Sequence, residues 1–145
     1  MIPCRFLLAL VCVTALRAQA PTAPVISARG VTNFFTEEPA PGTVALGGLV
    51  EISGLNLGPP EGATASATPW PTKLGDVQVV LGGRLAPLYS ISPGTIIAQV
   101  PPNANTGLVD VVVRRSTGNS APAHVIVNPL DPAVRTAKDQ GYGTP

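Results

Sequence analysis

Few residues in this sequence have the types and spacing that catalysis needs. A nucleophilic site requires a nucleophile beside a general base, and the only histidine is His124, which follows Pro122 in an expected strand. Both cysteines, Cys4 and Cys12, lie in an N-terminal stretch that we expect to be removed. We therefore interpret His124 as a half-exposed strand residue, and we predict no catalytic residue and no enzymatic activity.

The acidic residues do not indicate a site either. Paired carboxylates can serve acid–base chemistry, but the neighbours Glu37 and Glu38 lie in an expected turn, where solvation accounts for their charge. A metal site needs several converging ligands, whereas the aspartates are single and scattered, at Asp76, Asp110, Asp131 and Asp139. A calcium site built from loop carbonyl groups stays open as an alternative, but we predict no metal and no cofactor.

Two aromatic residues make binding a stronger candidate than catalysis. Trp70 stands between Pro69 and Pro71 at the end of a loop, residues 59–71, that is rich in alanine, threonine and proline. Loops of this length in compact domains are often functional. Trp70 could stack on a sugar or on a protein partner, with Tyr89 beside it. The alternative is structural: Trp70 covers the open end of the domain and Tyr89 forms a hydrogen bond within it.

Residues 1–20 have the pattern of an export signal. Arg5 provides a positive start, residues 6–16 form an uncharged apolar run, and Ala18-Gln19-Ala20 is a small-residue cleavage site. The run is shorter than the ~20 apolar residues that span a bilayer. We predict a signal peptide and an extracytoplasmic protein that is secreted, periplasmic or on the cell surface. An uncleaved membrane anchor and a lipid-anchored Cys12 are the alternatives.

The chain that remains after cleavage is nearly neutral. Removal of Arg5 and Arg17 leaves seven basic residues against eight acidic ones, a net charge near −1. This balance favours neither nucleic acid nor an anionic membrane surface as a partner. No second apolar run of spanning length follows the signal, so we expect no membrane contact beyond the signal peptide. Because no cysteine remains, the domain has to be stable by packing alone.

The distribution of proline and glycine favours strands over helices. The chain has 17 prolines and 15 glycines, and in a helix interior these residues cost about 3 and about 1 kcal/mol. We expect a first strand that begins with residues 25–27, and further strands at residues 46–53, 77–81, 84–91, 96–100, 108–114 and 123–127. Gly82-Gly83 is a two-residue hairpin signal. Val109, Val111 and Val113 share one face of their strand, and Arg114-Arg115 is expected to be a solvated strand end. The pattern predicts an all-β sandwich of about seven strands.

The segment LVEISGLNLGPP, residues 49–60, shows how one of these strands ends. Gly54 lets the chain bend off the sheet, and Asn56 can hydrogen-bond neighbouring backbone in the turn. Leu57 fills the end of the sandwich, and Gly58 provides a conformation forbidden to bulky residues. The Pro59-Pro60 pair stops the strand because proline cannot donate a ladder hydrogen bond.

This segment resembles the second-strand signature of IPT/TIG domains, which is an apolar strand followed by Gly-x-Asn-Leu/Phe-Gly. Three later blocks are similar to the same family: residues 71–79, residues 86–101 with a Ser-Pro-Gly turn at Pro93 and Gly94, and residues 101–107 before a Val-rich strand. The combination also resembles the N-terminal part of secreted acidobacterial proteins of unknown function. The resemblance implies an early-set, immunoglobulin-like β-sandwich over residues 21–130. Residues 131–145 are then an irregular tail, or the start of a second domain cut short.

The resemblance also implies a class of function. Such a domain would be a non-catalytic exported module for adhesion, spacing or protein–protein assembly, with a protein or glycan partner. One alternative is a carbohydrate-binding module centred on Trp70. Another is an accessory domain of a larger secreted enzyme. Because one fold carries many functions, these roles rest partly on analogy.

Overall fold

A computed structural model describes residues 22–36 and 42–130 of the chain. The expected signal peptide, the Glu37-Glu38 turn and the tail at 131–145 lie outside the described residues. The same holds for both cysteines and for Asp131 and Asp139.

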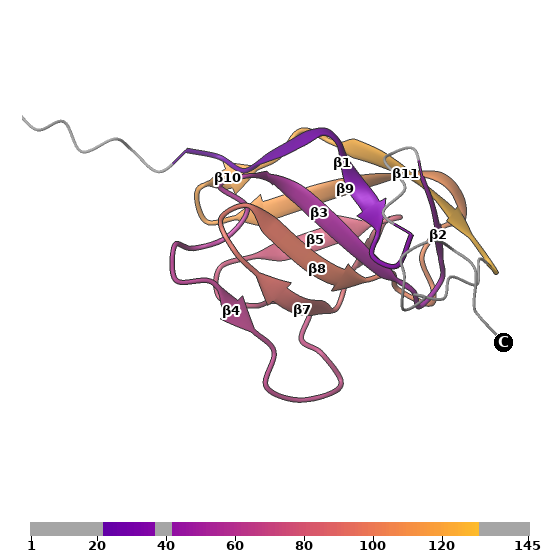
Figure 1. The fold of residues 1–145 in the computed structure, drawn as a ribbon, viewed down its shortest axis with the longest axis horizontal. Coiled ribbons are helices and arrows are strands. Elements are labelled where there is room, and N and C mark those ends of the chain that lie inside the picture. Colours follow the sequence, from indigo (N-terminus) through magenta and orange to yellow (C-terminus); the bar gives the residue numbers. More distant parts are fainter. Residues whose placement is uncertain (1–21, 37–41, 131–145) are drawn as a thin grey trace, which may run out of the picture.

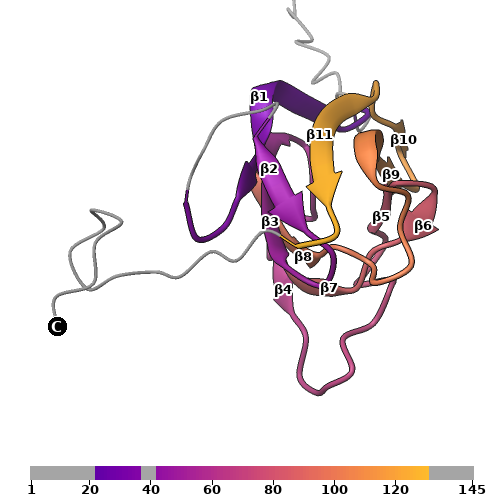
Figure 2. The ribbon, with the colours of Figure 1, turned by 90° about the vertical axis from the view of Figure 1, so that its right-hand side faces the viewer.

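The described residues form two β-sheets that pack face to face (Figure 1). The first sheet has the strand order β1-β3-β8-β7-β4, and the second has the order β2-β11-β9-β5-β6, with β10 paired to β9. Seen from the side, β9, β5 and β6 lie in the layer opposite β3 and β4 (Figure 2). The strands are β1 (Val25–Asn33), β2 (Thr43–Ala45), β3 (Leu49–Leu55), β4 (Ala63–Thr64), β5 (Gln78–Leu81), β6 (Arg84–Leu85), β7 (Leu88–Ile91), β8 (Thr95–Gln99), β9 (Gly107–Arg115), β10 (Gly118–Asn119) and β11 (Ala123–Asn128).

This architecture confirms the predicted all-β sandwich. Seven strands have four or more residues, and they account for the expected number of about seven. The other strands, β2, β4, β6 and β10, are pieces of two or three residues. These strands are too short to show an alternating hydrophobic pattern, so the sequence did not predict them.

The core lies between the sheets and follows the alternation of side chains along each strand. On β9 the inward residues Val109, Val111 and Val113 are buried, as predicted, and the residues between them point outward. The same rule buries Val79 and Leu81 on β5. Full burial of a valine or leucine side chain contributes roughly 1.5–3 kcal/mol, so the alternating rows stabilise the fold without a covalent link.

The Gly82-Gly83 prediction is also correct. The two residues join β5 to β6 with φ angles of +57° and +79°. Positive φ at both central positions defines the type I′ hairpin turn, whose twist matches that of the flanking strands. Glycine occupies both positions at no steric cost.

Two expected strands differ from the observed ones. The segment 84–91 divides into β6, which pairs with β5 in the second sheet, and β7, which pairs with β8 in the first. Ala86, which is buried, and Pro87, which is half-buried, carry the chain between the layers. The segment 46–53 becomes strand only from Leu49, because Gly47 takes a φ of +76° and forms a turn after β2.

The first strand begins at Val25, as expected, and carries an irregularity. Val25 and Ile26 pair with the end of β3, and the ladder resumes only at Val31 opposite Ile52. Between them the chain bulges out of register, with Arg29 at a φ of +58°. Such bulges bend an edge strand away from continuous pairing.

Candidate functional site

The two aromatic residues singled out in the sequence lie in contact. The ring centroids of Trp70 and Tyr89 are 5.0 Å apart, and the ring planes are tilted by 48°. The distance is in the range of favourable aromatic pairs. Nineteen positions separate the two residues in the sequence, and only the fold brings them together.

The local backbone explains how the pair forms. Strand β7 has a register shift against β8 between Leu88 and Ser90, and an extra residue of this kind re-aims a side chain out of the alternation. Tyr89 is that residue, and its side chain points outward while Leu88 and Ile91 stay buried. The long loop is held beside β7 by hydrogen bonds from Ala65 N to Tyr89 O and from Leu88 N to Pro71 O, both 2.8 Å.

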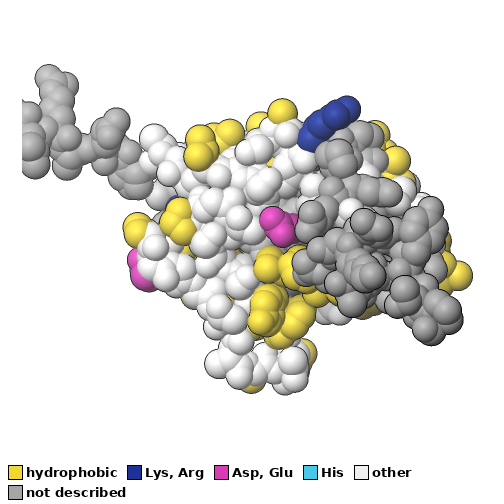
Figure 3. All heavy atoms as spheres, viewed as in Figure 1, with side chains coloured by type: hydrophobic (Ala, Val, Ile, Leu, Met, Phe, Trp, Pro, Cys, Tyr) yellow, Lys and Arg dark blue, Asp and Glu magenta, His cyan; other side chains and the backbone are white. Residues whose placement is uncertain are grey.

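The aromatic pair is accessible. Tyr89 is 40% exposed, and Trp70, which follows the cis Thr68–Pro69 peptide, is half-buried. Figure 3 shows hydrophobic side chains gathered on the molecular surface over β7, beside the loop that follows β4. Among the described residues, none forms a hydrogen bond with the Tyr89 hydroxyl, so the internal hydrogen bond considered as an alternative is not seen. The arrangement presents apolar ring surface and a free hydroxyl, which suits stacking and hydrogen bonding to a partner.

The signature turn has a structural role that differs in part from the expected one. Asn56 adopts a φ of +56°, a conformation that asparagine tolerates better than most residues. Its side-chain Nδ2 donates to Oγ1 of Thr22, 2.6 Å away, rather than to backbone in the turn as expected. Leu57 is fully buried, and its N–H donates to the carbonyl of Pro93 at 2.9 Å.

The glycines of the signature are needed for close approach rather than for unusual dihedrals. Neither Gly54 nor Gly58 has a positive φ, so the expected special conformation of Gly58 is wrong. A Cβ on Gly58 would lie 2.7 Å from the carbonyl oxygen of Ser92, and one on Gly54 would collide with the carbonyl of Val25. Gly94, in the Ser-Pro-Gly turn, has open space around it and accepts a hydrogen bond from the Gly54 N–H.

Arg115 is not the solvated strand end that the sequence suggested. Its side chain is only 11% exposed, and its Nη2 lies 3.1 Å from Oδ1 of Asp76. Its Nη1 donates to the carbonyl of Asn56 at 2.9 Å, and the Ser116 hydroxyl donates to Asp76 at 2.8 Å. Arg114, the preceding residue, is exposed as expected.

The ion pair with Arg115 helps to lower the pKa of the Asp76 carboxyl. Burial on its own would raise the pKa of the Asp76 carboxyl, but hydrogen bonds from Ser116 and Arg115 and the charge of Arg115 outweigh it. The pKa of Asp76 therefore lies below its ordinary value. The network joins the signature turn to the end of β9, and sequence reasoning missed it because Asn56, Asp76 and Arg115 are 20 to 59 positions apart.

His124 is exposed on β11, in agreement with its interpretation as a half-exposed strand residue. Its Nδ1 is 2.9 Å from Oδ1 of Asp110, its cross-strand neighbour on β9, and both side chains are more than half exposed. In the part of the chain that the structure describes, no three His, Cys, Asp or Glu side chains cluster as a metal site would require.

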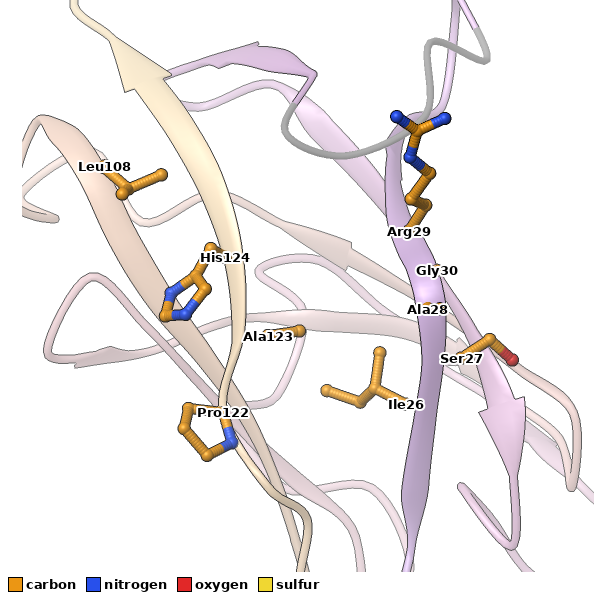
Figure 4. A pocket seen from close by; sticks show the side chains of 9 residues that line it. All are labelled: Ile26, Ser27, Ala28, Arg29, Gly30, Leu108, Pro122, Ala123 and His124. Atoms are coloured by element: carbon orange, nitrogen blue, oxygen red, sulfur yellow. The ribbon is translucent and has the colours of Figure 1, made fainter.

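A groove of about 440 Å³ opens between β1 and β11 beside His124. Ile26 and Ala123 point toward one another across it, and Arg29 points away (Figure 4). The groove is lined mainly by small and apolar side chains and by the irregular part of β1. The sequence held no signal for it, since it depends on where two strands of different sheets meet.

No helix in residues 22–36 and 42–130 has the length and apolar character needed to cross a membrane.

The matches to solved structures each cover only a small part of a larger protein. A gamma-CGTase from the alkalophilic Bacillus clarkii matches with a TM-score of 0.52 and 19% identity, over 77% of this chain and 13% of that one. An auxiliary nutrient binding protein from Bacteroides thetaiotaomicron matches with a TM-score of 0.45 and 17% identity, over 72% of this chain and 20% of that one. A search of curated protein sequences found no match. At 19% identity, the gamma-CGTase match shows the fold alone.

The family comparison is decisive for the class of domain. The sequence profile of the IPT/TIG domain matches residues 31–125. This range contains the strand-and-turn signature at Gly54, Asn56, Leu57 and Gly58 and the later turn at Pro93 and Gly94. With two packed sheets in the same residues, this chain belongs to the IPT/TIG family of immunoglobulin-like domains.

Proposed function

We propose that this chain is a non-catalytic, exported Ig-like module that serves protein–protein assembly, with the aromatic pair Trp70 and Tyr89 as its contact surface. The observation that carries the proposal is the contact between the two rings, 5.0 Å apart, at an accessible position. Tyrosine and tryptophan are enriched at the centres of protein interfaces, where they bury large area at small entropic cost.

Two local features of the backbone place the rings of Trp70 and Tyr89 together at the surface. A bulge in β7 and a held loop are both needed to place the rings together at the surface. Neither ring fills the core, which is formed by aliphatic side chains. An aromatic pair that adds little to the core but remains exposed is well suited to contact another molecule. Export to the periplasm, the medium or the cell surface remains part of the proposal, and its support is the signal pattern in residues 1–20.

Site-specific photocrosslinking in cells tests the assembly role. A benzophenone side chain at position 89 should form covalent adducts with a second protein, because the Tyr89 side chain is in the proposed contact. The matched control carries the same group at position 73, where exposed Lys73 lies outside the aromatic pair. Equal adduct yields at both positions, or none at position 89, would count against the contact surface.

The alternative is a carbohydrate-binding module at the same rings. The tilt of 48° between the two rings and the free Tyr89 hydroxyl favour it, because sugars combine an apolar face with hydroxyl groups. Trp70 is the only tryptophan, so its fluorescence reports directly on a bound glycan. A glycan array should give hits that disappear in Trp70→Ala, and an array with no hits discards this alternative.

An accessory role in a larger enzyme is the third candidate. The matching fold makes up 13% of the gamma-CGTase chain, so there it is one part among several. For this chain the proposal is checked by the coding sequence that follows Pro145. A catalytic domain in the same reading frame would support it, and a stop codon would refute it.

A further inference from the structure

The outer face of the second sheet carries an ordered pattern of apolar and charged side chains. Val80, Val112 and Leu85 are in register across β5, β9 and β6. They point outward, because the alternate residues of β5 and β9 fill the core. Val80 and Val112 are half-buried and Leu85 is exposed. Together they form a row of apolar side chains that runs perpendicular to the strands, called here the apolar row.

Opposite charges flank the apolar row on the central strand. Asp110 precedes the row on one side and Arg114 follows it on the other, each two residues from Val112 on the same face of β9. Both charged residues are exposed. At ~3.3 Å per residue they are about 13 Å apart with Val112 midway. His124 contacts Asp110 through one carboxylate oxygen, Oδ1.

We propose that this face binds a second copy of the same chain in a symmetric, face-to-face dimer. The twofold axis lies along the apolar row, in the plane between the two copies. Rotation about that axis keeps each strand over its own counterpart and reverses its direction. Val112 then meets Val112 of the second copy, and Asp110 meets Arg114 of the second copy twice over. An isologous contact of this kind requires a surface complementary to itself, and the charge pattern about Val112 meets that requirement.

Charge complementarity selects a second copy over an unrelated partner. A row with one charge sign on each side repels a copy that docks in the parallel orientation, because Asp110 would then face Asp110. It attracts a copy in the reversed orientation at both ends. Figure 2 shows β9, β5 and β6 on the right, in the layer opposite the first sheet.

The size of the face predicts a weak dimer. The strands β9, β11, β5 and β6 have nine, six, four and two residues, so at ~3.3 Å per residue and ~4.8 Å between strands the face spans roughly 330 Å² per copy. The two copies together would bury roughly 660 Å², which is below the range of standard-size interfaces and fits only a weak, transient contact. Association is therefore expected at high micromolar concentration, in an equilibrium that sedimentation can follow.

A charge-swap experiment on the full-length chain tests the proposal. Sedimentation equilibrium of the wild type should show a rise from monomer to dimer mass as concentration increases to about 0.5 mM. Asp110→Arg and Arg114→Asp each place like charges opposite one another and should weaken association at least about tenfold. An equimolar mixture of the two variants places unlike charges at both contacts, so the mixture should dimerise again.

The controls change the net charge without touching the face. Glu61→Arg matches the charge change of Asp110→Arg, and Lys73→Asp matches that of Arg114→Asp. Both residues are exposed and lie outside the second sheet, so both variants should associate like the wild type. Far-ultraviolet circular dichroism confirms that each variant is folded.

Each result of the sedimentation experiment either supports or overturns the proposed dimer. Loss in both single variants with recovery in the mixture supports the reversed, face-to-face contact. A wild type that stays monomeric at 0.5 mM, single variants that associate like the wild type, or a mixture that stays monomeric overturns it. None of these results depends on the aromatic pair, because Tyr89 lies on β7 of the other sheet and Trp70 lies in the loop beside it.

Discussion

Replacing Leu57 with alanine measures what the signature turn contributes to the fold. Leu57 is 0% exposed, at the point where the turn after β3 closes the end of the sandwich. The substitution deletes three carbon atoms, worth about 2.4 kcal/mol at ~0.8 kcal/mol per buried methylene. An unfilled cavity adds to that loss, and buried Leu→Ala substitutions cost 2–5 kcal/mol in general. We expect the free energy of unfolding to fall by about 3 kcal/mol.

Urea denaturation followed by Trp70 fluorescence and by circular dichroism is the assay. With a slope of about 2 kcal/mol per molar urea, the midpoint should fall by about 1.5 M. Coincident transitions by the two probes would justify a two-state treatment. Leu57→Asp should be more damaging still, because it buries a charge without a partner.

The neighbour Leu55 provides a matched control. It has the same side chain two residues earlier and is 67% exposed, so Leu55→Ala should cost less than about 1 kcal/mol. Equal midpoints for Leu57→Ala and Leu55→Ala would refute the assignment of Leu57 to the core.

Two further predictions concern the same end of the sandwich. Gly58→Ala should destabilise the domain by about 1–3 kcal/mol in urea, because the new Cβ would lie 2.7 Å from the Ser92 carbonyl oxygen, whereas Gly94→Ala, with open space around it, should be nearly neutral. Equal effects would show that backbone crowding is not the reason for Gly58. Because the folded-state pKa of Asp76 is depressed, its contribution is present above the ordinary pKa of about 4 and is lost as pH falls through the lower folded value. Asp76→Asn should therefore flatten the acid side of the stability curve measured from pH 5 to pH 2, and an unchanged slope would contradict the role of the Arg115 pair.

Much of the sandwich could be predicted from local sequence. The alternation Val109, Val111, Val113 assigned the buried face of β9 correctly, since side chains of a strand alternate whatever its neighbours are. Gly82-Gly83 predicted its hairpin for a similar reason, because the preference for positive φ belongs to the residue itself. The signature glycines marked the right turn, although the physical reason is crowding by neighbouring backbone rather than a special φ.

Features that depend on distant partners were not predictable from local patterns. The short strand β2 pairs in parallel with β11, which lies about 80 positions later, so nothing in its three residues indicates the pairing. Residues 84–91 read as one strand because nothing local shows that Ala86 and Pro87 cross from one sheet to the other. Arg115 looked solvated because its partner Asp76 is 39 positions away.

The candidate contact surface was also predictable only in part from the sequence. Residue type alone identified Trp70 and Tyr89 as the aromatic residues able to bind a partner, because a large ring with a polar group has that capacity in any fold. Their contact exists only in the tertiary structure, where a bulge in β7 turns Tyr89 outward and two backbone hydrogen bonds hold the loop of Trp70 beside it. Alternation and backbone preference are properties of neighbouring residues and can be read along the chain. Contacts between separate strands depend on the register in which the two sheets assemble, and only folding sets that register.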